Sequence, residues 1–193
     1  LELKLKQLIK SNSVDKIIVS SESSDALDIA RSFNEVDIHQ RDPRYSSNHI
    51  PMSEVYSYLA SDMHCNYIMW VPVTNPLIQP DIYTNAMQKF LKQDHNFDCL
   101  LSCVKVNDYL LKNFKPLNFT RNPWQRSQDL KGIHALSFAV NILERDNMIN
   151  WGSLVGNNPL FLELSREEST DIDFPDDFDY CEQLFIKNPK KYL

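Results

Sequence analysis

Short apolar segments alternate with amphipathic ones along the first 106 residues of the chain, and only a few residues separate one segment from the next. Residues 1–11 carry leucines at helical spacing, whereas residues 14–20 form a run rich in β-branched side chains, which is typical of a strand. The same reasoning predicts strands over residues 36–39, 66–73 and 99–106, and intervening helices that end near Phe33, Met63 and Gln93. Alternation with short connections indicates βαβ units. We therefore expect an α/β fold with a mainly parallel sheet flanked by helices.

The rest of the chain departs from this regular alternation. Residues 107–130 carry prolines and aromatic side chains and are too long for an ordinary connection, so we expect an excursion that acts as a lid or a subunit contact. Strands are expected to return over residues 135–142 and 159–164, and Pro175 suits the start of a last helix. A chain of 193 residues is the size of one domain, so residues 1–193 are expected to form a single unit.

The charge and hydropathy of the chain exclude some classes of partner. A net charge of −6 argues against a dedicated nucleic-acid binder, which usually carries a basic surplus. The sequence contains no apolar run near the roughly 20 residues that a membrane span needs, and no signal-peptide pattern opens it. We therefore expect a cytoplasmic protein with neither a nucleic-acid nor a membrane partner.

The sharpest candidate for chemistry is an acidic segment near the end of the chain. On an extended backbone, Asp171 and Asp173 point to one face and Ile172 to the other. Two adjacent carboxylates repel each other unless a cation lies between them, and such oxygen ligands suit Mg²⁺. Asp176 and Asp177 fall in the first turn of the last helix, where carboxylates complement the helix dipole. Taken alone, the Asp171 and Asp173 pair is also consistent with a solvated acidic run.

A second candidate is the loop that contains Thr74 and Asn75, at the carboxyl end of the strand over residues 66–73. That strand is apolar almost throughout, the signature of a strand covered on both faces. In open α/β sheets ligands bind outside such strand ends, where this loop offers a hydroxyl and an amide. A helix cap and turn is the alternative interpretation. Arg41 and Arg126 suit phosphate or carboxylate, or are solvated surface charges.

Taken in order, these segments resemble the acylneuraminate cytidylyltransferase family, the CMP-sialic acid synthetases. The resemblance runs over essentially the whole chain. Its most specific piece is Asp171-Ile172-Asp173 followed by Asp176-Asp177-Phe178, and the second is Val71-Pro72-Val73-Thr74-Asn75-Pro76-Leu77. The other segments that carry the resemblance are residues 14–22, 41–43, 126–130 and 135–140.

The resemblance implies a Rossmann-like fold of the nucleotide-diphospho-sugar transferase type. It implies an enzyme that uses CTP and Mg²⁺ to activate an acidic sugar, a sialic-acid-like nonulosonic acid, to its CMP-sugar with release of diphosphate. Asp171 and Asp173 would be the catalytic metal ligands, and Arg41 would lie beside the nucleotide with Ser47 or Ser53 nearby. The residues that the resemblance assigns to the sugar are Thr74, Asn75, Arg126, Gln128 and Ser137. The excursion would build a homodimer and contribute to a neighbour's site.

The departures from the family pattern leave alternatives open. The family's opening strand and its glycine-, arginine- and lysine-bearing nucleotide loop would precede Leu1. Pro72 stands where the family commonly has a glutamine that contacts the sugar, and Ser137-Phe138-Ala139 stands for the family's Asn-Gly-Ala. By the resemblance these two changes fall in the acceptor pocket, so the acceptor is a sialic-acid-like nonulosonic acid, a different nonulosonic acid or a compound of another class. A relative without catalytic activity, kept for binding or assembly, and a nucleotidyltransferase for another base are the alternatives.

Overall fold

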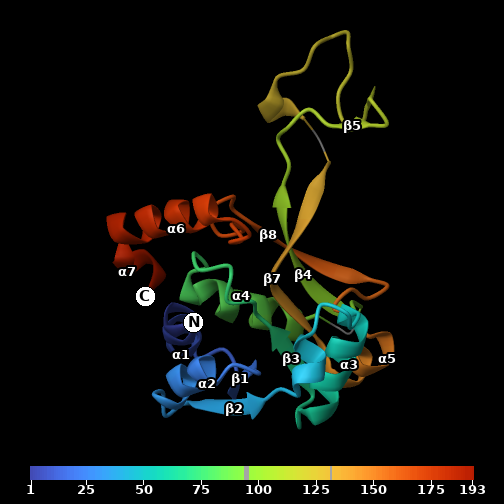
Figure 1. Ribbon diagram of the computed structural model, residues 1–193. Helices are drawn as coiled ribbons and strands as arrows, with labels where there is room; N and C mark the ends of the chain where they lie inside the picture. Colours follow the sequence, from blue (N-terminus) through green and yellow to red (C-terminus); the bar gives the residue numbers. More distant parts are fainter. Residues whose placement is uncertain (94–95, 131) are drawn as a thin grey trace.

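Strands and helices alternate through the first half of the computed structural model, which describes residues 1–93, 96–130 and 132–193 (Figure 1). The strands are β1 (Ile17–Ser21), β2 (Val36–Gln40), β3 (Tyr67–Trp70), β4 (Cys99–Lys105), β5 (Leu111–Lys112), β6 (Lys115–Pro116), β7 (His134–Glu144) and β8 (Pro159–Leu164). The helices are α1 (Glu2–Ser11), α2 (Ser24–Arg31), α3 (Met52–Asp62), α4 (Pro80–Leu91), α5 (Arg145–Trp151), α6 (Pro175–Lys187) and α7 (Pro189–Tyr192), with short 3-10 helices η1 (Pro43–Ser46) and η2 (Ser127–Asp129). The predicted alternation up to β4 is confirmed, and α5 and α7 are additional short helices.

The main sheet has four strands in the order β3-β7-β4-β8. Strand β4 is parallel to β8, whereas β7 is antiparallel to both β3 and β4. Strands β3, β4 and β8 therefore share one direction, and β7 opposes them because the chain leaves β4 through residues 107–130 and returns beside it. Strands β1 and β2 form a separate parallel pair. The expected α/β class is confirmed, with one antiparallel strand inserted into the main sheet.

The two faces of the main sheet bury alternate side chains of β4. Leu100 belongs to a cluster with Tyr83 and Phe90 of α4, whereas Leu101 belongs to a cluster with Met148 of α5. Successive strand residues point to opposite faces, so a strand covered on both sides needs an unbroken apolar run. Burial of one such leucine stabilises the fold by about 2 kcal/mol. The apolar run of β4 thus follows from its central place in the sheet.

Strand β3 is less buried than its sequence predicts. All four of its residues, Tyr67–Trp70, are only half-buried, although residues 66–73 predict a strand covered on both faces. Within the described part of the chain β3 pairs with β7 along one edge and ends the sheet. The prediction of full burial is therefore wrong for β3, because an apolar run does not distinguish an edge strand from a central one.

Helices α1 and α2 complete the body of the protein next to β1 and β2. Leu5, Ala30 and Val36 form their shared core. Helix α2 begins at the predicted cap, where Ser23 Oγ accepts a hydrogen bond from the Ala26 backbone N–H. In the described residues, none of the helices has the length and apolar character needed to cross a bilayer.

Residues 107–130 form an arm that projects beyond the body of the molecule (Figure 1). It contains the small hairpin β5-β6, whose turn residues Asn113 and Phe114 both have positive φ, as tight hairpin turns of the primed types require. The rings of Tyr109, Phe119 and Trp124 pack on one another, with centroids 5.1 to 5.7 Å apart. The arm occupies the residues of the expected excursion, and its role as a lid or in dimerisation stays a prediction.

Candidate active site

Two loops from distant parts of the chain are hydrogen-bonded to each other beyond the carboxyl ends of β3 and β8. The backbone N–H of Ile172 donates to the Thr74 carbonyl oxygen (2.9 Å), and Asn75 Nδ2 donates to the Thr170 carbonyl oxygen (3.0 Å). We call the joined segments the loop junction: residues 74–76 and 170–173. The loop junction brings two of the sequence candidates together, the polar loop after β3 and the acidic pair after β8.

The acidic pair in the loop junction faces solvent. Asp171 and Asp173 are exposed and Ile172 between them is half-buried, which is the alternation expected of an extended segment. The side chain of Asp177, in contrast, is bonded within the protein. Its Oδ2 accepts hydrogen bonds from the backbone N–H groups of Asp173 (3.1 Å) and Phe174 (2.8 Å). Asp177 thereby caps α6, while the carboxylates of the pair remain available for a ligand.

The acidic pair fits a metal ion that is shared with a phosphate. Within residues 1–93, 96–130 and 132–193, neither carboxylate lies within salt-bridge distance of a lysine, arginine or histidine. The same residues contain no group of three His, Cys, Asp or Glu side chains that would enclose an ion. Mg²⁺ typically takes one or two carboxylates and completes its shell with phosphate and water. Two free carboxylates therefore suit Mg²⁺ with a phosphate ligand better than a closed structural metal site.

A buried lysine supports the loop junction from α1. Lys4 is 3% exposed, and its Nζ donates to the Asn75 carbonyl oxygen (2.6 Å) and to the Tyr83 hydroxyl (2.6 Å). Burial lowers the pKa of Lys4 from 10.5 to about 7, because the ammonium loses its hydration. Gln7 Nε2 donates to the Pro76 carbonyl oxygen (2.7 Å). Asn75 is fully buried, so its side chain holds the two loops together, whereas Thr74 beside it is exposed.

The residues predicted to lie near the nucleotide share the connection from β2 to α3. Arg41 follows β2, and its Nη2 and Nε donate to the carbonyl oxygen (2.7 Å) and Oγ (3.3 Å) of Ser20. Ser47 is exposed, and its Oγ accepts a hydrogen bond from the His49 backbone N–H (3.2 Å). Ser53 is exposed in the first turn of α3. Among the described residues, no hydrogen bond links these three side chains to the loop junction.

Ser53 borders a shallow hollow between α3 and α5. The other residues that line it are Tyr45, Glu54, Ser57, Tyr58, Ser61, Asn150, Trp151 and Gly152. Gly152 ends α5 with φ +55°, and a Cβ at this position would lie 2.8 Å from the Ser53 carbonyl oxygen. The close approach of the two helices therefore requires glycine at this point.

The arm carries two of the predicted sugar contacts, Arg126 and Gln128. Arg126 Nε and Nη2 donate to the two carboxylate oxygens of Asp129 (2.7 and 3.1 Å), and this contact lowers the pKa of Asp129. Gln128 is exposed. Among the described residues, no hydrogen bond links either side chain to the loop junction of its own chain, and the arm that carries them projects from the body (Figure 1).

Ser137, the last predicted sugar contact, lies on β7 at an irregularity of the sheet. The register of β7 against β4 shifts between Leu101 and Cys103, and Phe138 has φ 52°. Ser137 Oγ donates to Ser102 Oγ (2.9 Å), so its hydroxyl is already bonded within the sheet. Such bulges are frequent next to active sites, where they redirect a side chain.

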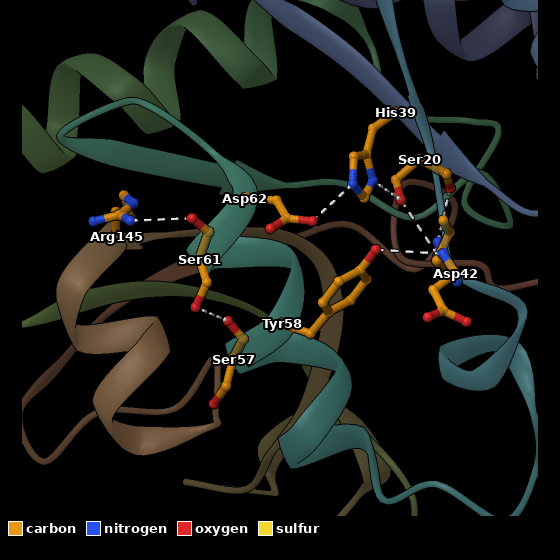
Figure 2. A network of polar contacts seen from close by, with 9 residues as sticks. Ser20, His39, Asp42, Ser57, Tyr58, Ser61, Asp62 and Arg145 are labelled. Atoms are coloured by element: carbon orange, nitrogen blue, oxygen red, sulfur yellow. Dashed lines mark hydrogen bonds and ion pairs between the residues drawn. The ribbon is translucent and has the colours of Figure 1, made fainter.

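The sequence reasoning missed two features, the buried Lys4 and the contacts of His39. Lys4 does carry a signal, because it lies on the same helical stripe as Leu1, Leu5 and Leu8 and so occupies the apolar face of α1. The contacts of His39 with its neighbours (Figure 2) carry no such signal, because they arise from the pairing of β1 with β2 and from the end of α3.

Comparisons with known proteins identify the family of the chain. A family model described as "Cytidylyltransferase" matches residues 1–130. The chain is 21% identical over 192 residues to N-acylneuraminate cytidylyltransferase A of Danio rerio, an alignment that covers 95% of this chain and 44% of that relative. The chain therefore spans less than half the length of this curated relative.

Solved structures with very different sequences share the fold. A CMP:2-keto-3-deoxy-manno-octonic acid synthetase in complex with CTP superposes with a TM-score of 0.66 at 12% identity, covering 96% of this chain and 87% of that one. A 4-diphosphocytidyl-2C-methyl-D-erythritol synthase from Anaerococcus prevotii superposes with a TM-score of 0.69 at 7% identity, covering 96% and 88%. At these identities the likeness concerns the Rossmann-like fold alone.

Proposed function

The chain belongs to the cytidylyltransferase family, and we propose that it transfers a cytidylyl group from CTP to an acidic sugar with release of diphosphate. The observation that carries this proposal is the loop junction. There the segment that carries the exposed Asp171 and Asp173 is hydrogen-bonded to the loop of the exposed Thr74, beyond the ends of β3 and β8. Ligands of open α/β sheets bind outside these strand ends.

The proposed reaction forms one bond and breaks another at the α-phosphorus of CTP. The anomeric hydroxyl oxygen of the sugar attacks that phosphorus and releases its proton to solvent, and the bond to the bridging oxygen breaks as diphosphate leaves with the bonding electron pair. Asp171 and Asp173 would hold Mg²⁺, which when bound supplies positive charge against the triphosphate. Arg41 would orient the nucleotide through its guanidinium, with Ser47 or Ser53 nearby. Thr74 would face the sugar, while Asn75 fixes the loop from within.

An acidic sugar is the best-supported class of acceptor. The names of the Danio rerio relative and of the synthetase solved with CTP specify N-acylneuraminate and 2-keto-3-deoxy-manno-octonic acid, and both compounds are acidic sugars. Among acidic sugars we propose a sialic-acid-like nonulosonic acid. The changed positions Pro72 and Phe138 lie where the family contacts the acceptor, so a sugar that differs from N-acylneuraminate around its substituents is compatible with the proposal.

We also propose that the arm forms a homodimer and delivers Arg126 and Gln128 to the partner's site. Phe114 is 96% exposed and Trp124 is 63% exposed, and apolar side chains gathered in this way usually mark an interface. A symmetric pair is the commonest way to cover such a surface. The guanidinium of Arg126 would then supply a cation for the sugar carboxylate, which the loop junction does not contain among the described residues.

Thermal unfolding with nucleotides tests the nucleotide part of this proposal. A ligand that binds only the folded state raises the melting temperature. We expect Mg²⁺ with CTP to raise it more than Mg²⁺ with ATP, GTP or UTP, and we expect Asp173→Asn to reduce the difference. A clear preference for another nucleotide would contradict the proposal.

A further inference from the structure

Figure 2 shows a hydrogen-bonded series of three side chains, Ser20, His39 and Asp62, and Arg41 donates a hydrogen bond to the Ser20 end of this series. Ser20 on β1 and His39 on β2 are register partners, and Ser20 Oγ lies 2.9 Å from His39 Nδ1. On the other side of the ring, His39 Nε2 lies 3.1 Å from Oδ2 of Asp62 at the end of α3. Arg41 Nε then donates to Ser20 Oγ (3.3 Å). We call Ser20, His39 and Asp62 the relay.

The chemistry of these groups gives the relay a direction. An ionised carboxylate only accepts hydrogen bonds, so Asp62 favours a proton on His39 Nε2. In the neutral ring Nδ1 is then an acceptor, and the Ser20 hydroxyl donates to it. The lone pairs of Ser20 Oγ are left to accept from Arg41. Each hydrogen bond thus sets the orientation of the next one.

The relay holds one side of the Arg41 guanidinium. Nε donates to Ser20 Oγ, Nη2 donates to the Ser20 carbonyl oxygen (2.7 Å), and the Arg41 backbone N–H donates to the Ser21 carbonyl oxygen (3.0 Å). Within the part of the chain that the structure describes, Arg41 Nη1 makes no hydrogen bond to protein. The guanidinium is therefore fixed at one edge and has donors left on the other, as a bidentate contact to phosphate requires.

We propose that the relay is a positioning device that holds Arg41 for a nucleoside triphosphate. The proposal rests on the proposed function, in which Arg41 contacts the nucleotide. Ser20, His39 and Asp62 would act through Arg41 and would not themselves touch the substrate. The series resembles the Ser–His–Asp arrangement of hydrolases, but its serine oxygen is directed to a guanidinium and its Asp62 end is the exposed one.

A double-mutant cycle separates positioning from a general structural role. The variants are His39→Leu, Arg41→Ala and the double variant, and the measured quantity is the Kd of CTP with Mg²⁺. We expect His39→Leu to weaken binding about tenfold when Arg41 is present, the equivalent of one hydrogen bond to a charged group. When Arg41 is alanine, the same change should alter Kd less than twofold.

His134→Leu is the matched control, because His134 Nε2 makes a similar contact with Glu163 (3.0 Å) on the main sheet, away from β1 and β2. It should leave the Kd of CTP unchanged. If His39→Leu does not fold, Asp62→Asn at the exposed end of α3 replaces it and should act in the same direction. Equal losses in both Arg41 backgrounds, or no loss in either, would overturn the proposal.

A second readout does not depend on the nucleotide. The Arg41 Nε proton should exchange slowly with water in the wild-type protein and quickly in His39→Leu and Ser20→Ala, as measured by NMR. Unchanged exchange would contradict the relay even if CTP does not bind, whereas slow exchange without CTP binding would contradict only the proposed function. Ester hydrolysis that is abolished by Ser20→Ala would show a hydrolytic triad instead.

Discussion

The loop junction and the arm differ in how their candidate functional side chains are held in place. In the loop junction a buried side chain holds the two loops together: Asn75 Nδ2 donates to the Thr170 carbonyl oxygen, and the Asn75 carbonyl oxygen accepts from the buried Lys4 of α1. In the arm several large apolar side chains, Phe114 and Trp124 among them, are exposed, and the rings of Tyr109 and Trp124 stack on each other. The first region is positioned by the core of its own chain. The second has an apolar surface that another molecule would have to cover.

The largest expected effect is in the loop junction, from Asp173→Asn. A carboxamide has almost the same volume as the carboxylate but binds Mg²⁺ weakly, so nucleotidyl transfer should fall about 100-fold or more while the fold is kept. Rate measurements at saturating CTP and circular dichroism check the two halves of this prediction. Full Mg²⁺-dependent activity in the variant would show that Asp173 is not a metal ligand.

Asp176→Asn is the matched control for that variant. Asp176 is an exposed carboxylate in the first turn of α6, and we assign it only an interaction with the helix dipole. Its loss should cost about 0.3 to 1 kcal/mol of stability and leave the transfer rate unchanged. A rate loss as large as that of Asp173→Asn would show that Asp176 also takes part in the transfer reaction.

The next largest effect is expected in the arm. The wild-type protein should sediment as a dimer at tens of micromolar, and Phe119→Asp combined with Trp124→Ala should raise the dimer dissociation constant about 30-fold or more. Ile186→Asp is the control, because Ile186 is 70% exposed on α6 outside the arm. A wild type that stays monomeric would refute the dimer and leave the arm as a lid.

The buried charge of Lys4 gives the body of the protein a pH dependence that the arm lacks. Between the folded pKa of about 7 and the ordinary value of 10.5, the unfolded chain holds a proton on Lys4 that the folded chain has lost. The contribution of Lys4 to the free energy of unfolding should therefore rise with pH in this window, by about 2 kcal/mol from pH 7 to pH 9, while the raised pKa values of the cysteine thiols act in the opposite direction toward pH 9. Urea unfolding at the two pH values measures it.

Lys4→Met should remove most of this rise, because no ammonium is then buried. Lys6→Met is the control, since Lys6 lies on the exposed side of α1 and pairs only with Glu2 (3.7 Å) in the described structure. It should keep the full rise. If Lys4→Met and the wild type gain stability equally between pH 7 and pH 9, the lysine is charged throughout that range.

The smallest effect concerns Phe138, near the base of the arm. Its φ of 52° lies in the left-handed region, which costs a residue with a side chain about 1 kcal/mol or more and costs glycine little. Phe138→Gly relieves this strain but loses ring contacts, so we expect a net change in unfolding free energy below about 1 kcal/mol. Phe161→Gly, in the extended strand β8, should cost more. Equal losses at the two positions would show that Phe138 is not strained.

The sequence predicts what depends on local pattern. The mostly apolar run of β4 and the proline at the start of α6 both identify their elements correctly. The apolar run before Thr74 gives no information on whether β3 is central or at an edge, because periodicity reports burial only on average. The direction of β7 is likewise absent from its residues, since it follows from the path of the chain through the arm.

The sequence predicts individual residues of the site but not the contacts between them. The sequence reasoning identifies Thr74 as a polar residue beyond a strand end and Asp171 as part of an acidic pair, but their loops are hydrogen-bonded across almost a hundred residues of chain. It expects Asn75 to face the sugar, whereas the structure buries it completely. The relay needs the register of β1 and β2 together with the end of α3, so no spacing along the chain reveals it.

Release of diphosphate tests the central claim most directly. The protein is incubated with Mg²⁺, CTP and an acidic sugar, with N-acylneuraminate and 2-keto-3-deoxy-manno-octonate as separate acceptors, and the CMP-sugar is identified by mass spectrometry. We predict diphosphate release that needs CTP, Mg²⁺ and an acidic sugar together, and that is lost in Asp173→Asn. Folded protein that binds CTP but releases diphosphate with neither sugar would contradict the proposed acceptor class, and folded protein that does not bind CTP would contradict the proposed activity itself.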